Sequence, residues 1–113
     1  MTIQRIEPGT RMSQAVIHNG VIYLAGQVAE GANVTEQTKA ILANIDRLLG
    51  EAGSSKSKLL QAQIWLVEIA TFGEMNAVWE GWIDPKNPPA RATVEARLAA
   101  RQYLVEIMVT AAV

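Results

Sequence analysis

The sequence contains no cysteine and only one histidine among its 113 residues. Without cysteine the chain forms no disulfide, no thiolate metal site and no cysteine nucleophile. One histidine does not build a zinc site unaided, and no carboxylate cluster at ligand spacing accompanies it. A Ser-His-Asp set and the glycine motifs of nucleotide-binding loops are also missing. These absences predict a protein that carries no metal and no other cofactor.

An excess of charge of one sign is missing too. The formal net charge is −1 and the isoelectric point about 5.8, with lysine and arginine scattered along the chain. Phosphate backbones are bound by massed basic side chains, so this pattern argues against a nucleic-acid partner. No segment has the apolar core of a signal peptide or the length of a membrane span. We expect one domain over residues 1–113, located in the cytoplasm and without a membrane partner.

Hydrophobic periodicity predicts six strands and two helices. An Asn-Gly pair at Asn19–Gly20 predicts a tight hairpin, since both residues tolerate positive φ. Asn33 with Glu36 predicts the start of the first helix and Gly53 its end, while Thr71-x-x-Glu74 predicts a capping box for the second. The expected strands are residues 2–7, 13–18, 21–25, 60–68, 91–98 and 103–113.

This order, β-β-β-α-β-α-β-β, predicts an α+β fold with a mixed six-stranded sheet. Right-handed crossovers put both helices on the same face of that sheet. Residues 103–113 are nonetheless apolar on both faces, except for Glu106 and Thr110. Because two helices cover only one face of a sheet, the other face needs a partner chain, and we expect an oligomer.

The last third of the chain holds the best candidates for chemistry. Residues 91–98 alternate between polar and apolar side chains, as in a half-buried strand. A carboxylate in an apolar strand, such as Glu106, must be paired, hydrogen-bonded or protonated. A hairpin turning at residues 99–102 would place Arg91 beside it. Two interpretations stay open for the pair. It is either a structural salt bridge or a site in which Arg91 binds a carboxylate and Glu106 holds a water as acid or base.

Two further residues have alternative interpretations. Gly26 interrupts a strand, which indicates either a bulge or tight packing, or a backbone that a ligand approaches closely. Asn76 lies beside the apolar stripe of the second helix, as an exposed amide or as a hydrogen-bonding group of a pocket.

Three segments resemble the reactive-intermediate deaminase family, also called RidA or YjgF and formerly endoribonuclease L-PSP. They are LAGQV at 24–28, LLGEAGSS at 48–55 and PPARATVEARL with VEIMVTAAV between 88 and 113. The resemblance extends over nearly the whole chain. It implies a chorismate-mutase-like homotrimer with ligand pockets in the clefts between subunits.

The resemblance also implies roles for individual residues. Arg91 would bind the carboxylate of 2-aminoacrylate or a related enamine or imine acid. Glu106 would place the water that attacks the imine carbon, yielding a 2-keto acid and ammonia. The backbone at Thr93 and Gly26 would orient the substrate, and Asn76 would lie near the pocket.

Three positions depart from the pattern of active family members. Met12 replaces a common Tyr, Ala25 a Ser and Thr93 a Cys. Met12 and Ala25 remove two hydroxyls and leave the pocket more apolar, and the departures together place the chain in a divergent subgroup. Two other functions follow from the same resemblance. One is a catalytically silent trimer that binds small carboxylates or regulates a partner, and the other is an RNA-cleaving translation inhibitor.

Overall fold

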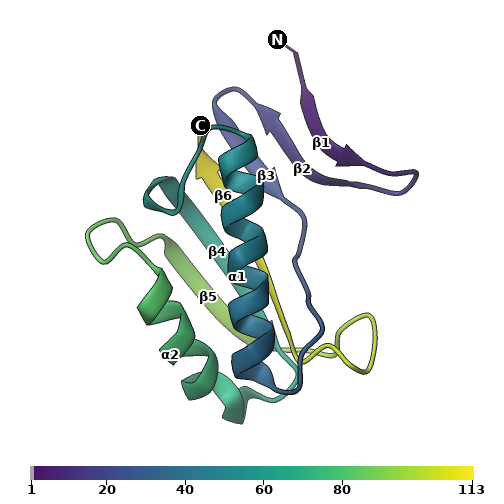
Figure 1. Cartoon of the computed structure of the whole chain (residues 1–113), viewed down its shortest axis with the longest axis vertical. Helices are drawn as coiled ribbons and strands as arrows, with labels where there is room; N and C mark the ends of the chain where they lie inside the picture. Colours follow the sequence, from purple (N-terminus) through teal and green to yellow (C-terminus); the bar gives the residue numbers. More distant parts are fainter. Residues whose placement is uncertain (1) are drawn as a thin grey trace.

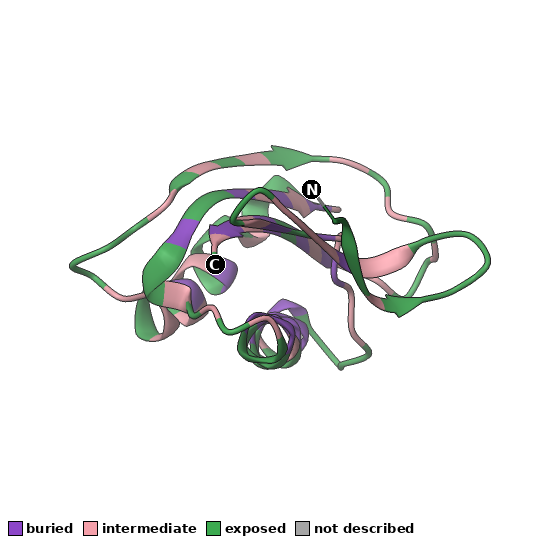
Figure 2. Ribbon diagram, turned by 90° about the horizontal axis from the view of Figure 1, so that it is seen from above, coloured by how far each residue is buried: buried purple, intermediate pink, exposed green. Residues whose placement is uncertain are grey.

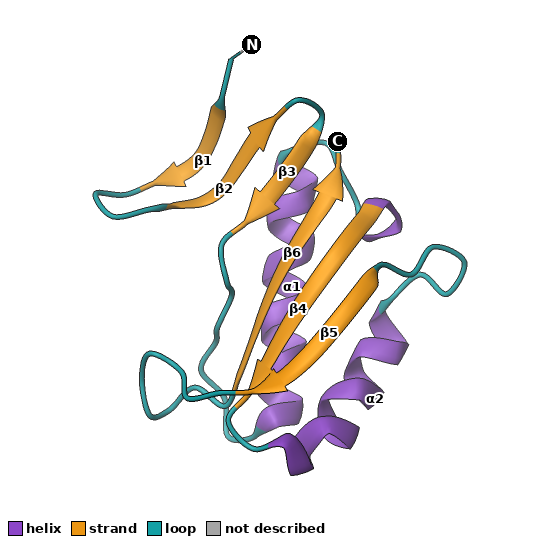
Figure 3. Cartoon of the chain, turned by 180° about the vertical axis from the view of Figure 1, so that it is seen from behind, coloured by secondary structure: helices purple, strands orange, loops and turns teal. Residues whose placement is uncertain are grey.

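The computed structural model describes residues 2–113 and contains one mixed six-stranded sheet with two helices on a single face (Figure 1). The strand order is β1-β2-β3-β6-β4-β5, with β4 and β5 parallel and the other neighbours antiparallel (Figure 3). The predicted α+β fold is confirmed. The elements are β1 Gln4–Pro8, β2 Ser13–His18, β3 Val21–Leu24, α1 Val34–Glu51, β4 Leu59–Leu66, α2 Phe72–Trp82, β5 Ala90–Glu95 and β6 Val105–Ala112, with short 3-10 helices at Lys56–Lys58 and Ile69–Thr71.

Local signals give the turn and the first helix correctly. Asn19 and Gly20 join β2 to β3 with φ values of +54° and +76°, as a tight hairpin requires. The side chain of Asn33 accepts a hydrogen bond of 2.9 Å from the Glu36 amide and caps α1. Gly53, with φ of +77°, follows the helix in the left-handed conformation that terminates it.

The second helix begins where expected but without the predicted capping box. A 3-10 turn at Ile69–Thr71 runs directly into α2, so Thr71 has φ −86° and ψ 5° rather than the extended conformation of an N-cap. Its hydroxyl donates instead to the Glu68 carbonyl at 2.7 Å. The capping-box prediction is therefore wrong, because the chain enters α2 from a helical turn.

The predicted hairpin between the last two strands is also wrong. β5 pairs in parallel with β4, while β6 pairs with β3 and β4, so β4 separates β5 from β6. The burial pattern gives the reason. Every second residue of β6 is fully buried beneath the helices, and only a central position in the sheet provides that cover. These residues are Val105, Ile107, Val109 and Ala111.

The two faces of the sheet differ in what covers them. Both helices pack on one face, and the described residues leave the other open (Figure 2). On the open face Tyr23, Val94 and Met108 remain 50%, 45% and 39% exposed. In β5 the polar side chains of Arg91 and Thr93 are half-buried, while Ala92 and Val94 on the other face are exposed. This is the reverse of the usual half-buried strand, whose apolar side chains face inward.

Candidate functional site

Arg91 lies on the helix-facing side of β5, against two aromatic rings of α2. Its Cζ atom is 5.3 Å from the ring centroid of Trp79 and 5.5 Å from that of Phe72. Both distances are within the range of cation–π attraction. Among residues 2–113 no carboxylate lies within salt-bridge distance of Arg91. The rings therefore hold the guanidinium group while its N–H fork stays available for an anion.

Thr93 lies two residues after Arg91 on β5, and Asn76 lies on α2, the helix that supplies the two rings. The Thr93 hydroxyl oxygen is buried, and within the described residues it has no hydrogen-bond partner. Asn76 lies on α2 between Phe72 and Trp79 in sequence and donates to Glu80 Oε1 at 2.9 Å. A guanidinium without an acidic partner and an unsatisfied hydroxyl on one strand are both groups that can donate hydrogen bonds to a small anion such as a carboxylate. We call Arg91, Thr93 and Asn76 the arginine half-site.

Glu106 and Gly26 meet on the opposite side of the sheet. A Cβ atom added to Gly26 would lie 2.0 Å from Glu106 Oε2, so only glycine leaves room for the carboxylate in this position. Partial burial raises the pKa of Glu106 above that of an ordinary glutamate. The observed approach of the Glu106 side chain agrees with the tight-packing interpretation of Gly26.

Ala25 and Met12 belong to the same region. The Ala25 amide donates to the carbonyl of Gln14 at 2.8 Å, and Met12 precedes Gln14 by two residues in the turn between β1 and β2. The Met12 side chain is 51% exposed. We call Met12, Ala25, Gly26 and Glu106 the glutamate half-site.

A salt bridge between Arg91 and Glu106 is ruled out by their positions. Arg91 pairs in register with the buried Ala62 of β4 and faces the helices. Glu106 alternates with the buried Val105 and Ile107 of β6, so it points to the open face. The structural salt bridge that the sequence left open is therefore wrong, and one chain does not bring its two half-sites together.

The contacts of Phe72, Trp79 and Gln27 were not predicted from the sequence. The two aromatic residues belong to the apolar stripe of α2, a pattern that indicates core packing, and Trp79 is indeed buried. Their spacing of seven residues, two helical turns, does place both rings along one face. Gln27 is only 4% exposed, and a glutamine next to a strand glycine in an apolar segment is the signal that could have identified it.

Neither half-site resembles a metal centre. Within residues 2–113 no group of three His, Asp or Glu side chains is placed to hold a metal ion.

No helix in this part of the chain is long and apolar enough to cross a membrane. A hollow of about 770 Å³ lies between α1 and α2 and is lined by Leu42, Val78 and Trp82 among others, away from both half-sites.

A mixed six-stranded sheet in this strand order, with two helices on one face, is a chorismate-mutase-like α+β fold. Residues 2–113 match the family model described as Endoribonuclease L-PSP, so the chain belongs to this family, which includes the RutC and YjgF proteins. The family resemblance found in the sequence is confirmed.

Similar proteins span the same length. A RutC family protein of Haemophilus influenzae is 48% identical over 98% of both chains, and the RutC family protein YoaB of Escherichia coli is 44% identical over 100% of both. The crystal structure of NMB1025, a YjgF family protein of Neisseria meningitidis, is similar with a TM-score of 0.97. It is 45% identical and covers 99% of this chain and 95% of its own.

Proposed function

We propose that this protein catalyses the hydrolytic deamination of reactive enamine and imine intermediates of small 2-amino acids, of the 2-aminoacrylate type. The products are 2-keto acids and ammonia. The observation that carries the proposal is Arg91, a cation held by aromatic rings and without an acidic partner among the described residues. Such a group is suited to a carboxylate that is common to all these substrates.

A complete site needs the glutamate half-site of a second copy. Arg91 and Glu106 lie on opposite faces of the sheet, and the open face carries exposed apolar side chains that a partner would cover. Packing of copies in a closed homotrimer would bring Arg91 of one copy near Glu106 of the next. The pocket would then lie in the cleft between subunits.

The reaction in this cleft is hydrolysis of a C=N bond. An enamine first becomes the imine by taking a proton on carbon. The water oxygen then bonds to the imine carbon while the Glu106 carboxylate accepts one water proton and the nitrogen takes a proton from solvent, which gives a carbinolamine. Glu106 passes its proton to the carbinolamine nitrogen, the C–N bond breaks and ammonia leaves with the bond electrons. The carbinolamine hydroxyl returns its proton to solvent as the C=O bond forms. One water enters and one ammonia leaves, without any oxidant or reductant.

The three departures from the family pattern are compatible with this route. Because water is the nucleophile, Thr93 in place of Cys removes no bond-forming group. Free imines hydrolyse unaided, so the protein contributes orientation and a held water. Met12 and Ala25 remove two hydroxyls and favour substrates with apolar side chains.

The direct test is keto-acid release from freshly generated imines. An amino-acid oxidase or a serine/threonine dehydratase supplies imines with several side chains, and wild type is compared with Arg91→Ala. We expect acceleration by wild type and not by the variant. Release no faster than in buffer for every imine would contradict the proposal.

Two other functions predict different results. The first alternative is a regulator that binds carboxylates without catalysis. It is favoured because a single chain forms the arginine half-site without Glu106. It predicts keto-acid binding that depends on Arg91 and no turnover. RNA cleavage, the activity in the family's name, predicts RNA affinity that falls steeply with salt. The net charge of −1 argues against it.

A further inference from the structure

We infer that Gln27 and Asn44 are positioning residues that aim the backbone N–H of Gly26 at the substrate in the glutamate half-site. The inference rests on the proposed function and adds to it a chain of side-chain amides outside the reacting groups. We call Gln14, Gln27, Asn44 and Arg47 the amide relay.

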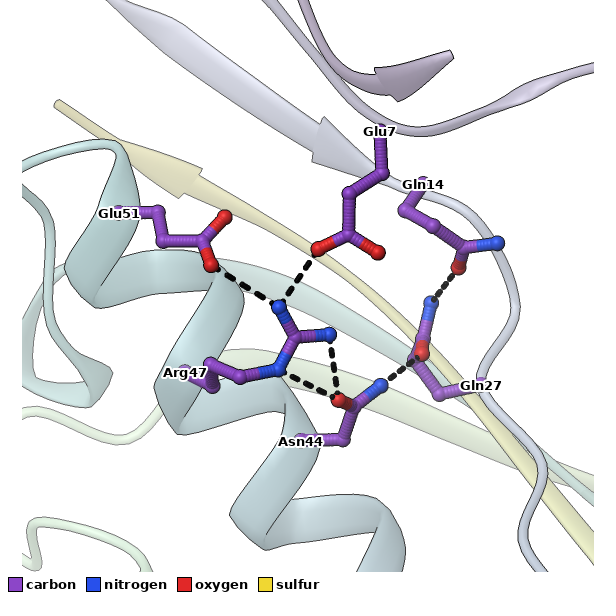
Figure 4. Close-up of polar contacts among 6 residues, drawn as sticks. All are labelled: Glu7, Gln14, Gln27, Asn44, Arg47 and Glu51. Carbon is purple, nitrogen blue, oxygen red and sulfur yellow. Dashed lines mark hydrogen bonds and ion pairs between the residues drawn. The ribbon is translucent and has the colours of Figure 1, made fainter. Parts of the chain in front are cut away.

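The amide relay connects the surface of α1 to the segment that holds Gly26 (Figure 4). Asn44 Nδ2 donates to Gln27 Oε1, and Gln27 Nε2 donates to Gln14 Oε1 at 3.1 Å and to the Ala25 carbonyl at 3.0 Å. At the other end Arg47 donates to Asn44 Oδ1 through Nε at 3.0 Å and Nη2 at 2.8 Å. The Gln27 side chain therefore has a partner for its oxygen and two for its nitrogen.

The hydrogen bonds of the amide relay can run in one direction only, because an arginine side chain donates hydrogen bonds and accepts none. Two Arg47 donors fix the Asn44 oxygen toward Arg47, so the Asn44 nitrogen faces Gln27. The Gln27 oxygen must then accept, which turns its nitrogen toward the Ala25 carbonyl. Arg47 is itself held by Glu7 at 2.6 Å and Glu51 at 2.9 Å.

The direction of the relay fixes the peptide group before Gly26. In a trans peptide the C=O and N–H bonds point in opposite directions. Because Gln27 Nε2 holds the Ala25 oxygen, the Gly26 N–H of the same peptide points away from the Gln27 side chain. Among residues 2–113 this N–H has no hydrogen-bond acceptor. It is an oriented donor on the residue that the Glu106 carboxylate borders.

The backbone of Gln27, as well as its side chain, fixes the position of Gly26. Gln27 and Ile107 exchange both of their backbone hydrogen bonds, at 2.8 and 3.1 Å. Gly26 and Glu106 each precede a bridged residue, and because the bridge is antiparallel they lie diagonally across it. Gln27 thus holds Gly26 at a fixed distance from Glu106 through its backbone and sets the N–H direction through its side chain.

Asn44→Asp tests the relay with almost no change in shape. Aspartate still accepts from Arg47 but cannot donate to Gln27. Gln27 must then rotate its amide, which sets its oxygen against the Ala25 carbonyl and removes the donor that holds this peptide. Asn33→Asp is the matched control, since it makes the same chemical change at the exposed cap of α1, where aspartate caps as well as asparagine.

The measurements are the Gly26 ¹H–¹⁵N resonance, with and without 2-oxobutanoate, and the kcat and KM of imine hydrolysis. In wild type and Asn33→Asp we expect 2-oxobutanoate to shift the Gly26 resonance. In Asn44→Asp we expect the ligand-free resonance to move, the response to ligand to vanish and kcat/KM to fall about tenfold or more. If Asn44→Asp does not fold, Arg47→Met, at a half-exposed residue, removes the group that orients the relay and should give the same changes in part.

Two failures are distinguishable. If Asn44→Asp folds, binds 2-oxobutanoate and turns over imines as Asn33→Asp does, the inference is wrong while the proposed function stands. If wild type neither binds the keto acid nor accelerates hydrolysis, the proposed function is wrong and the inference is lost with it.

Discussion

Arg91 shows how a single cation can be kept in place without an acid. Its guanidinium rests on Trp79 and Phe72, and no carboxylate of the described residues lies within salt-bridge distance. Removing one partner of a buried ion pair lowers the stability of a protein by about 3–5 kcal/mol, because the other charge stays buried and unpaired. Removing Arg91 leaves no such charge among the described residues.

Arg91→Ala is therefore expected to reduce the free energy of unfolding by only about 1 kcal/mol and to abolish keto-acid binding. Thermal unfolding and equilibrium binding of 2-oxobutanoate measure the two effects. Arg5→Ala, at an exposed arginine of β1, is the control and should change neither. An Arg91→Ala protein that unfolds easily yet retains full activity would show that Arg91 supports the fold rather than the substrate.

Glu106 gives a prediction in pH because its pKa is raised by burial. The folded protein takes up this proton at a higher pH than the unfolded chain, so the ionised carboxylate lowers stability at neutral pH. Glu106→Gln should thus be as stable as wild type or more stable at neutral pH, and the difference should disappear as the pH falls below the raised pKa. Urea denaturation between about pH 4 and pH 8 measures it.

The activity of wild type should depend on the same group. In the proposed mechanism hydrolysis requires ionised Glu106, so kcat/KM should fall as the pH drops through a value above the usual glutamate pKa. Glu106→Gln should be inactive across the range. Turnover by Glu106→Gln at the wild-type rate would exclude Glu106 as the acid or base.

At the scale of the element, α2 supplies the rings under Arg91. Phe72 is 37% exposed, so replacing it has little effect on the core. We expect Phe72→Leu to weaken keto-acid binding and raise KM by roughly two- to fivefold with kcat unchanged, because a surface cation–π contact is worth about 0.5–1 kcal/mol. Trp82→Leu on the same helix, which lies against α1 rather than Arg91, should lower stability without changing KM. Equal effects of both variants on KM would refute a specific role for Phe72.

At the scale of the whole molecule, the division of the site between two copies can be tested by mixing. Homotrimers of Arg91→Ala and of Glu106→Gln should each be inactive. When the two are unfolded together and refolded as mixed trimers, about a quarter of the clefts should combine an intact Arg91 with an intact Glu106. Activity that reappears only after joint refolding supports the composite site, and no recovery in verified mixed trimers would contradict it. Light scattering on wild type measures the trimer itself.

The sequence by itself determined the features that local chemistry controls. The Asn19–Gly20 turn, the Asn33 cap and Gly53 after α1 occur as predicted, because each depends on the backbone preferences of one to four residues. The number and order of elements follow from hydrophobic periodicity, with ends that differ by a few residues, as for β5, which ends at Glu95 rather than at residue 98. Glu106 was identified for the same kind of reason, as the one carboxylate of an apolar strand, and Arg91 as a cation of the alternating strand before it.

Only the tertiary structure decided which groups face one another. The sequence placed Arg91 beside Glu106 in a hairpin, but the core needs the buried face of β6 between β3 and β4, and this moves Glu106 away from β5. The contacts of Arg91 with its two rings and of Asn44 with Gln27 join residues 12 to 19 positions apart in the chain, so no local pattern reveals them. Strand position is set by competition for burial across the whole chain, and that competition separates the candidate site into two half-sites on opposite faces of the sheet.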